Sequence, residues 1–188
     1  MKNANKNHKD LVVDILTESF RNNKSVQYIL KDTSQKRLRA LMEYSFDTCI
    51  TSGKVLLSDD LKACALISFP EKKKTTIGSL LSEVKLILNG VGIANISKVL
   101  KREKKISSHY PKTDIYYLWF IGVHPDHQGR GVGGKLLAEI IEDSKKMNRP
   151  IYLETSTIEN LPFYEKYGLS VYSELDLTYT LYLINSLH

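Results

Sequence analysis

The first half of the chain alternates helical and strand patterns of hydrophobic residues. Over residues 9–22 and again over 34–51, hydrophobic side chains recur every three or four positions, which predicts two helices. The second has Ser34 in position to cap its start and Gly53 just beyond its end. The expected buried faces are Leu11, Val12, Ile15, Leu16 and Phe20, and then Leu38, Leu41, Met42, Phe46 and Cys49. Residues 54–60 and 61–70 predict two strands with a tight turn at Asp59 and Asp60.

The second half predicts helices first and then alternating strands and helices. Residues 79–90 place five hydrophobic side chains on one helical stripe that stops at Gly90, namely Leu80, Leu81, Val84, Ile87 and Leu88. A less regular helical segment follows to about residue 107. We then expect a strand at 114–123, a glycine turn, a helix at 131–147 and a strand at 151–155. A short helix at 160–167 and strands at 169–176 and 178–184 finish the chain. The helix at 131–147 should bury Leu136, Leu137, Ile140, Ile141 and Met147. This order predicts one mixed α/β domain over residues 1–188.

Composition removes several classes of function. The net charge is +6, but the basic residues stand in short runs at 72–74, 101–102, 104–105 and 145–146, without the interleaved aromatic residues of a nucleic-acid platform. No hydrophobic run is long enough to cross a bilayer, and the first six residues are polar. We therefore expect a cytoplasmic protein without nucleic-acid or membrane partners. Cys49 and Cys64 are expected to be free, buried thiols. No spacing of Cys, His and Asp predicts a metal site.

The turn between the strand at 114–123 and the next helix is unusually rich in glycine. Gly129, Gly131, Gly133 and Gly134 lie within six residues. The first amides of a helix lack intrahelical partners, and glycine lets the backbone approach phosphate oxygens closely. The amides of residues 130–134 are therefore predicted to hold a pyrophosphate. A P-loop is excluded because Leu136 follows the lysine at 135. The dinucleotide spacing G-x-G-x-x-G does fit residues 129–134, but it lies late in the chain and no second nucleotide half is present.

A second reading of the turn is Q-x-x-G-x-G over residues 128–133. With it, the stretches "LWFIGVHPDHQGRGVG" at 118–133 and "ETSTIENLPFYEKYGL" at 154–169 resemble the two signatures of the GNAT superfamily of acetyl-CoA-dependent N-acetyltransferases. Residues 109–173, about a third of the chain, most resemble the puromycin N-acetyltransferase type. The resemblance implies a central, mostly antiparallel twisted sheet with a splayed strand pair, flanked by helices. The polar first ten residues imply that the family's first edge strand is missing or very short, and the helical insert at 76–108 should border the acceptor pocket.

The resemblance also implies acetyl-CoA as the acetyl donor, with CoA as product. Gly122 interrupts a strand of bulky residues, which indicates a bulge or a close backbone approach. In the family, backbone near that position pairs with pantetheine and polarises the thioester carbonyl. The residues expected to bind the cofactor are Ile121, Gly122, Val123, Gln128, Gly129, Arg130, Gly131, Val132, Gly133, Gly134, Lys135 and Asn160.

The candidates for proton transfer are Tyr164, Glu154 and His109. Tyr164 matches the family's tyrosine, which donates a proton to the departing sulfur; Tyr167 is its rival, and only the motif register separates the two. Glu154 and His109 are alternative general bases for the amine. We expect acetyl transfer to a primary amine of a small molecule by direct attack. A protein N-terminus or lysine as acceptor, a non-catalytic acyl-CoA sensor, and a homodimer all remain open.

Overall fold

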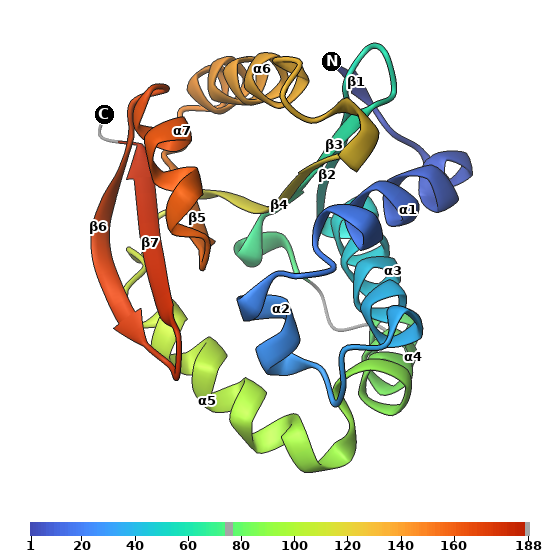
Figure 1. The fold of residues 1–188 in the computed structure, drawn as a ribbon. Coiled ribbons are helices and arrows are strands. Elements are labelled where there is room, and N and C mark those ends of the chain that lie inside the picture. The colour runs from blue at the N-terminus through green and yellow to red at the C-terminus, as the bar shows by residue number, and fades with distance from the viewer. Residues whose placement is uncertain (74–76, 187–188) are drawn as a thin grey trace.

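A seven-stranded sheet with strand order β1-β2-β3-β4-β5-β7-β6 lies at the centre of the fold (Figure 1). The computed structural model describes residues 1–73 and 77–186; Lys74 of the first basic run and Thr76 of the expected insert lie outside this part. The strands are β1 (Lys2–Asn3), β2 (Gly53–Leu57), β3 (Ala63–Ser68), β4 (Tyr116–Val123), β5 (Ile151–Thr155), β6 (Leu169–Asp176) and β7 (Thr180–Ser186). All neighbouring strands are antiparallel except β4 and β5.

Helices cover both faces of this sheet. They are α1 (Lys9–Ser19), α2 (Lys24–Ile29), α3 (Gln35–Ser52), α4 (Ile77–Leu86), α5 (Ile96–Ser107), α6 (Val132–Lys146) and α7 (Leu161–Glu165), with short 3-10 turns at Lys6–His8, Pro70–Lys72, Ile93–Asn95, Pro125–His127 and Ile158–Asn160. A π-helical turn, Ile87–Val91, extends α4. The expected helices and strands are thus present with shifted ends, and α2 is an element that the hydrophobic pattern did not predict.

Alternation along the strands decides which helices lie on which face. Val55 and Leu57 of β2 face a core built with α1, α2 and α3, whereas Leu56 between them faces a second core built with α6 and α7. A third, smaller cluster joins Ile106 of α5 to the β6–β7 hairpin. The predicted faces of α1 and α3 lie in the first core, and the two thiols, at positions 49 and 64, are buried and unpaired.

The parallel pair β4–β5 separates soon after it forms. The two strands are in register only at Tyr116 with Ile151 and at Tyr117 with Tyr152. Beyond these pairs β4 continues beside β3, while β5 continues beside β7. The splayed strand pair expected from the sequence is therefore confirmed, and it opens a wedge in the middle of the sheet.

Two local expectations left alternatives open, and the structure decides between them. The bulge in β4 lies at Trp119, where the register with β3 shifts, and not at Gly122. Gly122 instead allows a close approach of α1, because a Cβ there would stand 3.0 Å from both Leu16 Cδ2 and Ser19 Oγ. The first edge strand exists, but it has only two residues, β1, paired antiparallel with β2.

Candidate functional site

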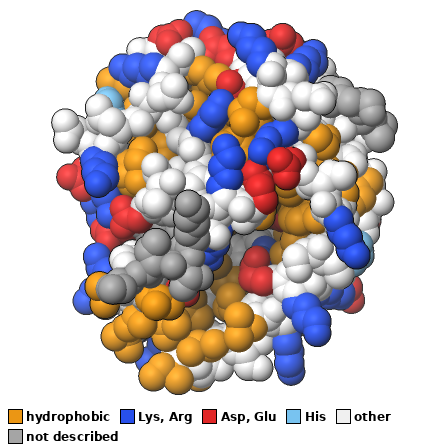
Figure 2. All heavy atoms as spheres, turned by 180° about the vertical axis from the view of Figure 1, so that it is seen from behind, with side chains coloured by type: hydrophobic (Ala, Val, Ile, Leu, Met, Phe, Trp, Pro, Cys, Tyr) orange, Lys and Arg blue, Asp and Glu red, His pale blue; other side chains and the backbone are white. Residues whose placement is uncertain are grey.

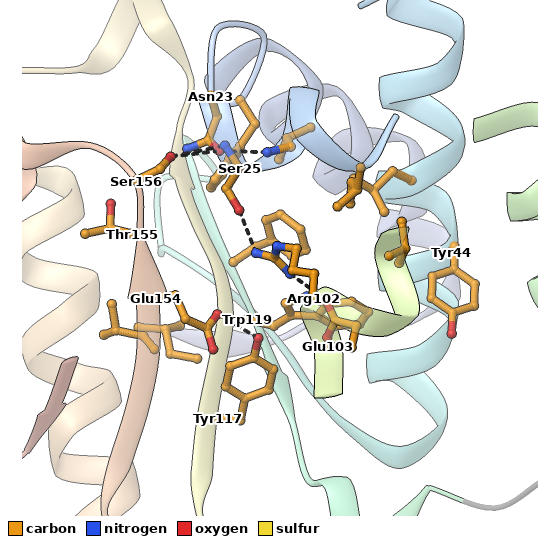
Figure 3. A pocket seen from close by; sticks show the side chains of 18 of the residues that line it. Asn23, Ser25, Tyr44, Arg102, Glu103, Tyr117, Trp119, Glu154, Thr155 and Ser156 are labelled. Atoms are coloured by element: carbon orange, nitrogen blue, oxygen red, sulfur yellow. Dashed lines mark hydrogen bonds and ion pairs between the residues drawn. The ribbon is translucent and has the colours of Figure 1, made fainter. Parts of the chain in front are cut away.

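A cavity of about 420 Å³ lies over the wedge between β4 and β5 (Figure 3). The sheet supplies its floor, while α2, α3, the insert that contains α4 and α5, and α7 supply its walls. Six aromatic side chains line it, namely Phe20, Tyr44, Tyr117, Trp119, Phe120 and Tyr164. This volume is typical of a site for a small molecule. The insert does border the cavity, through Glu83, Leu86, Val91, Val99, Leu100, Arg102 and Glu103.

Glu154 faces this cavity from β5. Because the strands are in register at Tyr117, that phenol lies across the wedge and donates a hydrogen bond of 2.9 Å to Glu154 Oε2. The other oxygen, Oε1, is buried and has no hydrogen-bond partner among the described residues. Burial raises the pKa of the Glu154 carboxyl to about 8; Arg102 opposes this shift and Glu103 adds to it. A carboxyl with this pKa exchanges its proton near neutral pH.

The other ionised groups of the cavity are already paired. Lys73 forms an ion pair of 3.3 Å with Glu83, and Arg102 forms one with Glu103. Within the described part of the chain, Glu154 forms no ion pair with any cation. It is therefore the carboxylate of the cavity that is available to a cationic or amine ligand.

Arg102 ties the insert to two other parts of the fold. Its Nη2 donates to Ser25 Oγ at 2.7 Å, and its Nε donates to the Tyr179 hydroxyl at 3.2 Å. Ser25 in turn donates its backbone N–H to Ser156 Oγ at 3.2 Å, at the end of β5. These contacts, visible in Figure 3 for the labelled residues, join polar groups from α5, α2 and the last hairpin beside the cavity. Arg102 is not among the site residues predicted from the sequence, although its spacing from Val99 and Ile106 places all three on one face of a helix.

The glycine loop has the backbone that its sequence predicted. Gly129 and Gly131 have φ of 73° and 79°, a region that disfavours other residues, and a Cβ on either would meet nothing within 4 Å. Gly131 is the N-cap of α6, and Lys135 donates the first intrahelical bond back to it. The loop therefore presents open backbone at a helix start, as an anion site requires.

Gly133 and Gly134 also allow close packing, because neither has a side chain. A Cβ on Gly133 would stand 3.0 Å from Val123 Cγ2, and one on Gly134 would overlap with the Tyr167 hydroxyl. Gln128 also has a structural contact, because its Nε2 donates to Val123 O at 3.1 Å and so braces the loop against the end of β4.

The charged residues of the loop lie beside a second, smaller hollow. Arg130, Val132 and Lys135 line this space of about 250 Å³, together with Ser58, Asp59, Asp60, Gly131, Leu136 and Glu139. Lys135 Nζ lies 3.5 Å from Asp59 Oδ2, a weak contact between exposed groups. This hollow lies between the glycine loop and residues 58–60, and it shares no lining residue with the large cavity.

Tyr164 and Asn160 both line the cavity, from α7 and the turn before it. The Tyr164 side chain is only 6% exposed, and burial raises the pKa of its phenol to about 12, so it keeps its proton at neutral pH. Asn160 stands at the N-cap position of α7 but makes no side-chain capping bond, which leaves its amide free for a ligand. Tyr167 does not line the cavity and packs against Gly134 and the Phe163 ring.

Of the other predicted site residues, some line the cavity and others do not. Ile121 lines the cavity, whereas Gly122 and Val123 continue β4 toward the glycine loop. His109 lies away from the cavity. It is exposed just after α5, where its ring nitrogen contacts Lys105 O at 2.9 Å. The structure thus brings Glu154, Tyr164, Asn160 and Ile121 to one cavity and leaves His109 out of it.

Known proteins resemble this chain in sequence over most of its length. It is 28% identical over 175 residues to an uncharacterized N-acetyltransferase of Schizosaccharomyces pombe, covering 87% of this chain and 71% of that protein. It is 27% identical over 189 residues to a probable serine/threonine-protein kinase of Dictyostelium discoideum, covering 88% of this chain. The chain spans only 20% of the length of that second protein.

Solved structures resemble it over their whole length at low identity. A histone acetyltransferase HPA2 and related acetyltransferase from Corynebacterium glutamicum has a TM-score of 0.68 at 17% identity, covering 100% of this chain and 95% of that one. Arylalkylamine N-acetyltransferase 2 from Aedes aegypti has a TM-score of 0.69 at 13% identity, covering 99% and 97%. At identities this low, the structural similarity establishes the fold alone. The likeness to the puromycin type stays a prediction. Residues 87–169, which hold the splayed strands, the glycine loop and α7, match the acetyltransferase (GNAT) domain model, and the chain has the fold of GNAT acetyltransferases.

Proposed function

We propose that this chain is an acyltransferase that moves the acetyl group of acetyl-CoA to a primary amine of a small, partly aromatic molecule. The amine attacks directly while both substrates are bound. The observation that carries the proposal is Glu154, the unpaired carboxyl of an aromatic cavity, hydrogen-bonded to Tyr117 and with its pKa raised to about 8.

The acceptor occupies the cavity with its amine toward Glu154. An alkylamine is mostly protonated at neutral pH and must lose a proton before it can attack a carbonyl. Glu154 takes this proton, directly or through one water, because its pKa of about 8 makes it a far better base than an ordinary carboxylate. The aromatic walls bury the rest of the acceptor.

The residues of the glycine loop fit the pyrophosphate of CoA. Gly129 and Gly131 leave open space above a backbone with positive φ, at the start of a helix of 15 residues. When bound, acetyl-CoA supplies a thioester whose carbonyl carbon accepts the amine. The backbone of Ile121, Gly122 and Val123 would run alongside the pantetheine and polarise that carbonyl. Arg130, Lys135 and the amides of 130–134 would hold the phosphates.

Tyr164 and Asn160 complete the cofactor side. Tyr164 is protonated and faces the cavity, so it donates a proton to the sulfur as the thiolate leaves. Asn160, free of any capping bond, would contact the cofactor near the same place. His109 has no part in this proposal because it lies outside the cavity.

The alternatives fit these features less well. A sensor of acyl-CoA needs neither a base nor an acid, yet both groups face one cavity. A protein N-terminus or lysine would need a groove for a peptide, whereas the cavity is about 420 Å³, a volume that suits a small molecule. The arylalkylamine N-acetyltransferase of Aedes aegypti, which shares this fold, is named for acceptors of the class that the aromatic lining would suit.

A screen of acceptors tests the proposal. The protein is incubated with acetyl-CoA and, separately, with aromatic monoamines, aliphatic monoamines, polyamines, and peptides that offer a free N-terminus or a lysine; free thiol release is recorded. We expect turnover with aromatic monoamines to exceed that with peptides by at least tenfold, and the Glu154→Gln variant to lose it. Turnover only with peptides would overturn the small-molecule acceptor. Tight CoA binding without turnover on any amine would favour a sensor.

A further inference from the structure

The hydrophobic stripe predicted at residues 80–88 faces solvent instead of a core. Six of the seven large hydrophobic side chains that the described part of the chain leaves exposed belong to the insert, with exposed fractions between 50% and 72%: Leu80, Leu81, Val84, Leu88, Ile93 and Leu100. Figure 2 shows hydrophobic side chains gathered at the foot of the molecule, beside a hollow. A gathered exposed patch of this kind is unusual on a monomer and marks an interaction surface.

Basic side chains border this hydrophobic patch. Helix α5 exposes Lys101 and Lys104, and neither forms an ion pair with the residues that the structure describes. Two further lysines of the helix have partners, because Lys98 lies 3.7 Å over the Tyr28 ring and Lys105 donates to Asp176 O at 2.9 Å. The acidic residue of the helix, Glu103, is paired with Arg102. Leu100 and Lys104 are four residues apart and share a face, so a cation stands directly beside the patch. The border is therefore positive.

We propose that the insert docks on an anionic lipid membrane, with the hydrophobic patch entering the headgroup region and the lysines of α5 contacting lipid phosphates. A bilayer offers the two complements that this surface needs, an apolar interior and a negative surface, in adjacent layers. Lysine side chains can keep their charged ends among the headgroups while their stems lie along the apolar layer. A second copy of the chain would instead bring another positive border to the contact.

In this proposal the helices of the insert lie in the plane of the membrane and do not cross it. No single helix of the described residues is long and hydrophobic enough to cross a bilayer; Gly78–Val91 and Ile93–Ser107 reach that length only together, across a bend of 99°. The sequence-based expectation of no membrane partner rested on the lack of a spanning run, which an in-plane contact does not need. Because Leu100 of the patch also lines the large cavity, the docked surface adjoins the candidate site.

The test is flotation of the full chain with vesicles of phosphatidylcholine alone and of phosphatidylcholine mixed with an equal part of phosphatidylserine. It does not depend on the proposed activity. We expect binding to the mixed vesicles only, and a loss of binding as salt rises from about 0.1 M to about 1 M, which shortens the Debye length from about 10 Å to about 3 Å. No binding to the mixed vesicles at low salt would overturn the proposal.

Two double variants locate the surface. Leu81→Asp with Leu88→Asp should weaken binding at least tenfold, about 1.4 kcal/mol, and Lys101→Glu with Lys104→Glu should do the same. The matched controls are Ile158→Asp, at the exposed hydrophobic residue outside the insert, and Lys146→Glu on α6; both should bind as the wild type does. Circular dichroism checks that each variant is folded. Wild-type binding by the folded insert variants would overturn the proposal, and so would a homodimer in sedimentation that these variants abolish without any vesicle binding.

Discussion

The Tyr117 hydroxyl on β4 donates a hydrogen bond of 2.9 Å to Glu154 on β5, across the point where these parallel strands separate. The contact exists because the only in-register pairs of the two strands lie just before the wedge, so one side chain from each strand meets over the opening. It holds one oxygen of the carboxylate, while the other is buried and has no hydrogen-bond partner in the part of the chain that the structure describes. The geometry therefore positions a single acceptor oxygen for a proton.

The first prediction concerns the pH dependence of the reaction. If Glu154 is the base, kcat/KM should rise with pH and level off above about 8, the pKa of its carboxyl in the folded protein. Glu154→Gln should lower kcat/KM by ~10²–10⁴-fold, because general base catalysis typically contributes that much. The measurement is a pH–rate profile with the best amine from the screen. A variant that keeps the wild-type profile, inflection included, would remove Glu154 from the mechanism.

The Glu154 carboxyl should also make the stability of the fold depend on pH. Activity should rise with pH, whereas the contribution of this group to stability should fall. Its pKa is about 8 in the folded protein and ~4.3 in the unfolded chain, so the folded state holds more protons between these values. Folded-state stability from this group is therefore present at low pH and is lost as pH rises through this window. Thermal unfolding should be measured at several pH values. The Tm of Glu154→Gln minus the Tm of the wild type should increase as the pH is raised. A constant difference would mean that the carboxyl titrates near its ordinary pKa.

Two neighbours should move the inflection in opposite directions. Tyr117→Phe removes a hydrogen bond that favours the charged carboxylate, so the inflection of the pH–rate profile should move to higher pH. Glu103→Gln removes a negative charge that raises the pKa of Glu154, and it should move the inflection to lower pH. Two shifts of opposite sign are hard to attribute to general damage. Shifts of the same sign would contradict the assigned electrostatics.

Local patterns predicted the elements but not how distant elements meet. The face of α3, the glycine loop and the cavity position of Tyr164 follow from spacing or from motifs within a few residues. The pair formed by Tyr117 and Glu154 depends on strand register between residues 37 positions apart, which no local pattern contains.

Other failures have equally physical causes. The stripe at residues 80–88 shows that a helix has a hydrophobic face, but periodicity does not say what covers that face. Helix α2 has only six residues and so no period to detect. His109 was chosen for its ordinary imidazole chemistry, and chemistry alone does not place a side chain in a cavity.

Phenylalanine variants of Tyr164 and Tyr167 test which tyrosine donates the proton to the leaving sulfur. Tyr164→Phe should lower kcat by ~10²–10⁴-fold with nearly unchanged CoA affinity, because the ring still packs and only the proton donor is lost. Tyr167→Phe should change kcat little, since that hydroxyl contacts Gly134 and not the cavity. Steady-state kinetics and CoA titration measure both. Full activity in Tyr164→Phe with loss in Tyr167→Phe would show that the hydroxyl beside the start of α6 is the acid.

The glycine loop offers a prediction with an internal control. Gly131 and Gly168 have φ of 79° and 75°, and a Cβ on either meets nothing within 4 Å. Valine at each position should therefore cost similar backbone strain, ~1–2 kcal/mol, which lowers the Tm of a chain this long by about 2–8 °C. Only Gly131→Val also places a branched side chain over the open amides of α6, where it would exclude a pyrophosphate. We expect Gly131→Val to weaken CoA binding at least tenfold in calorimetry, and Gly168→Val to bind as the wild type does. Equal affinities in the two folded variants would show that the loop is a structural turn and that CoA binds elsewhere.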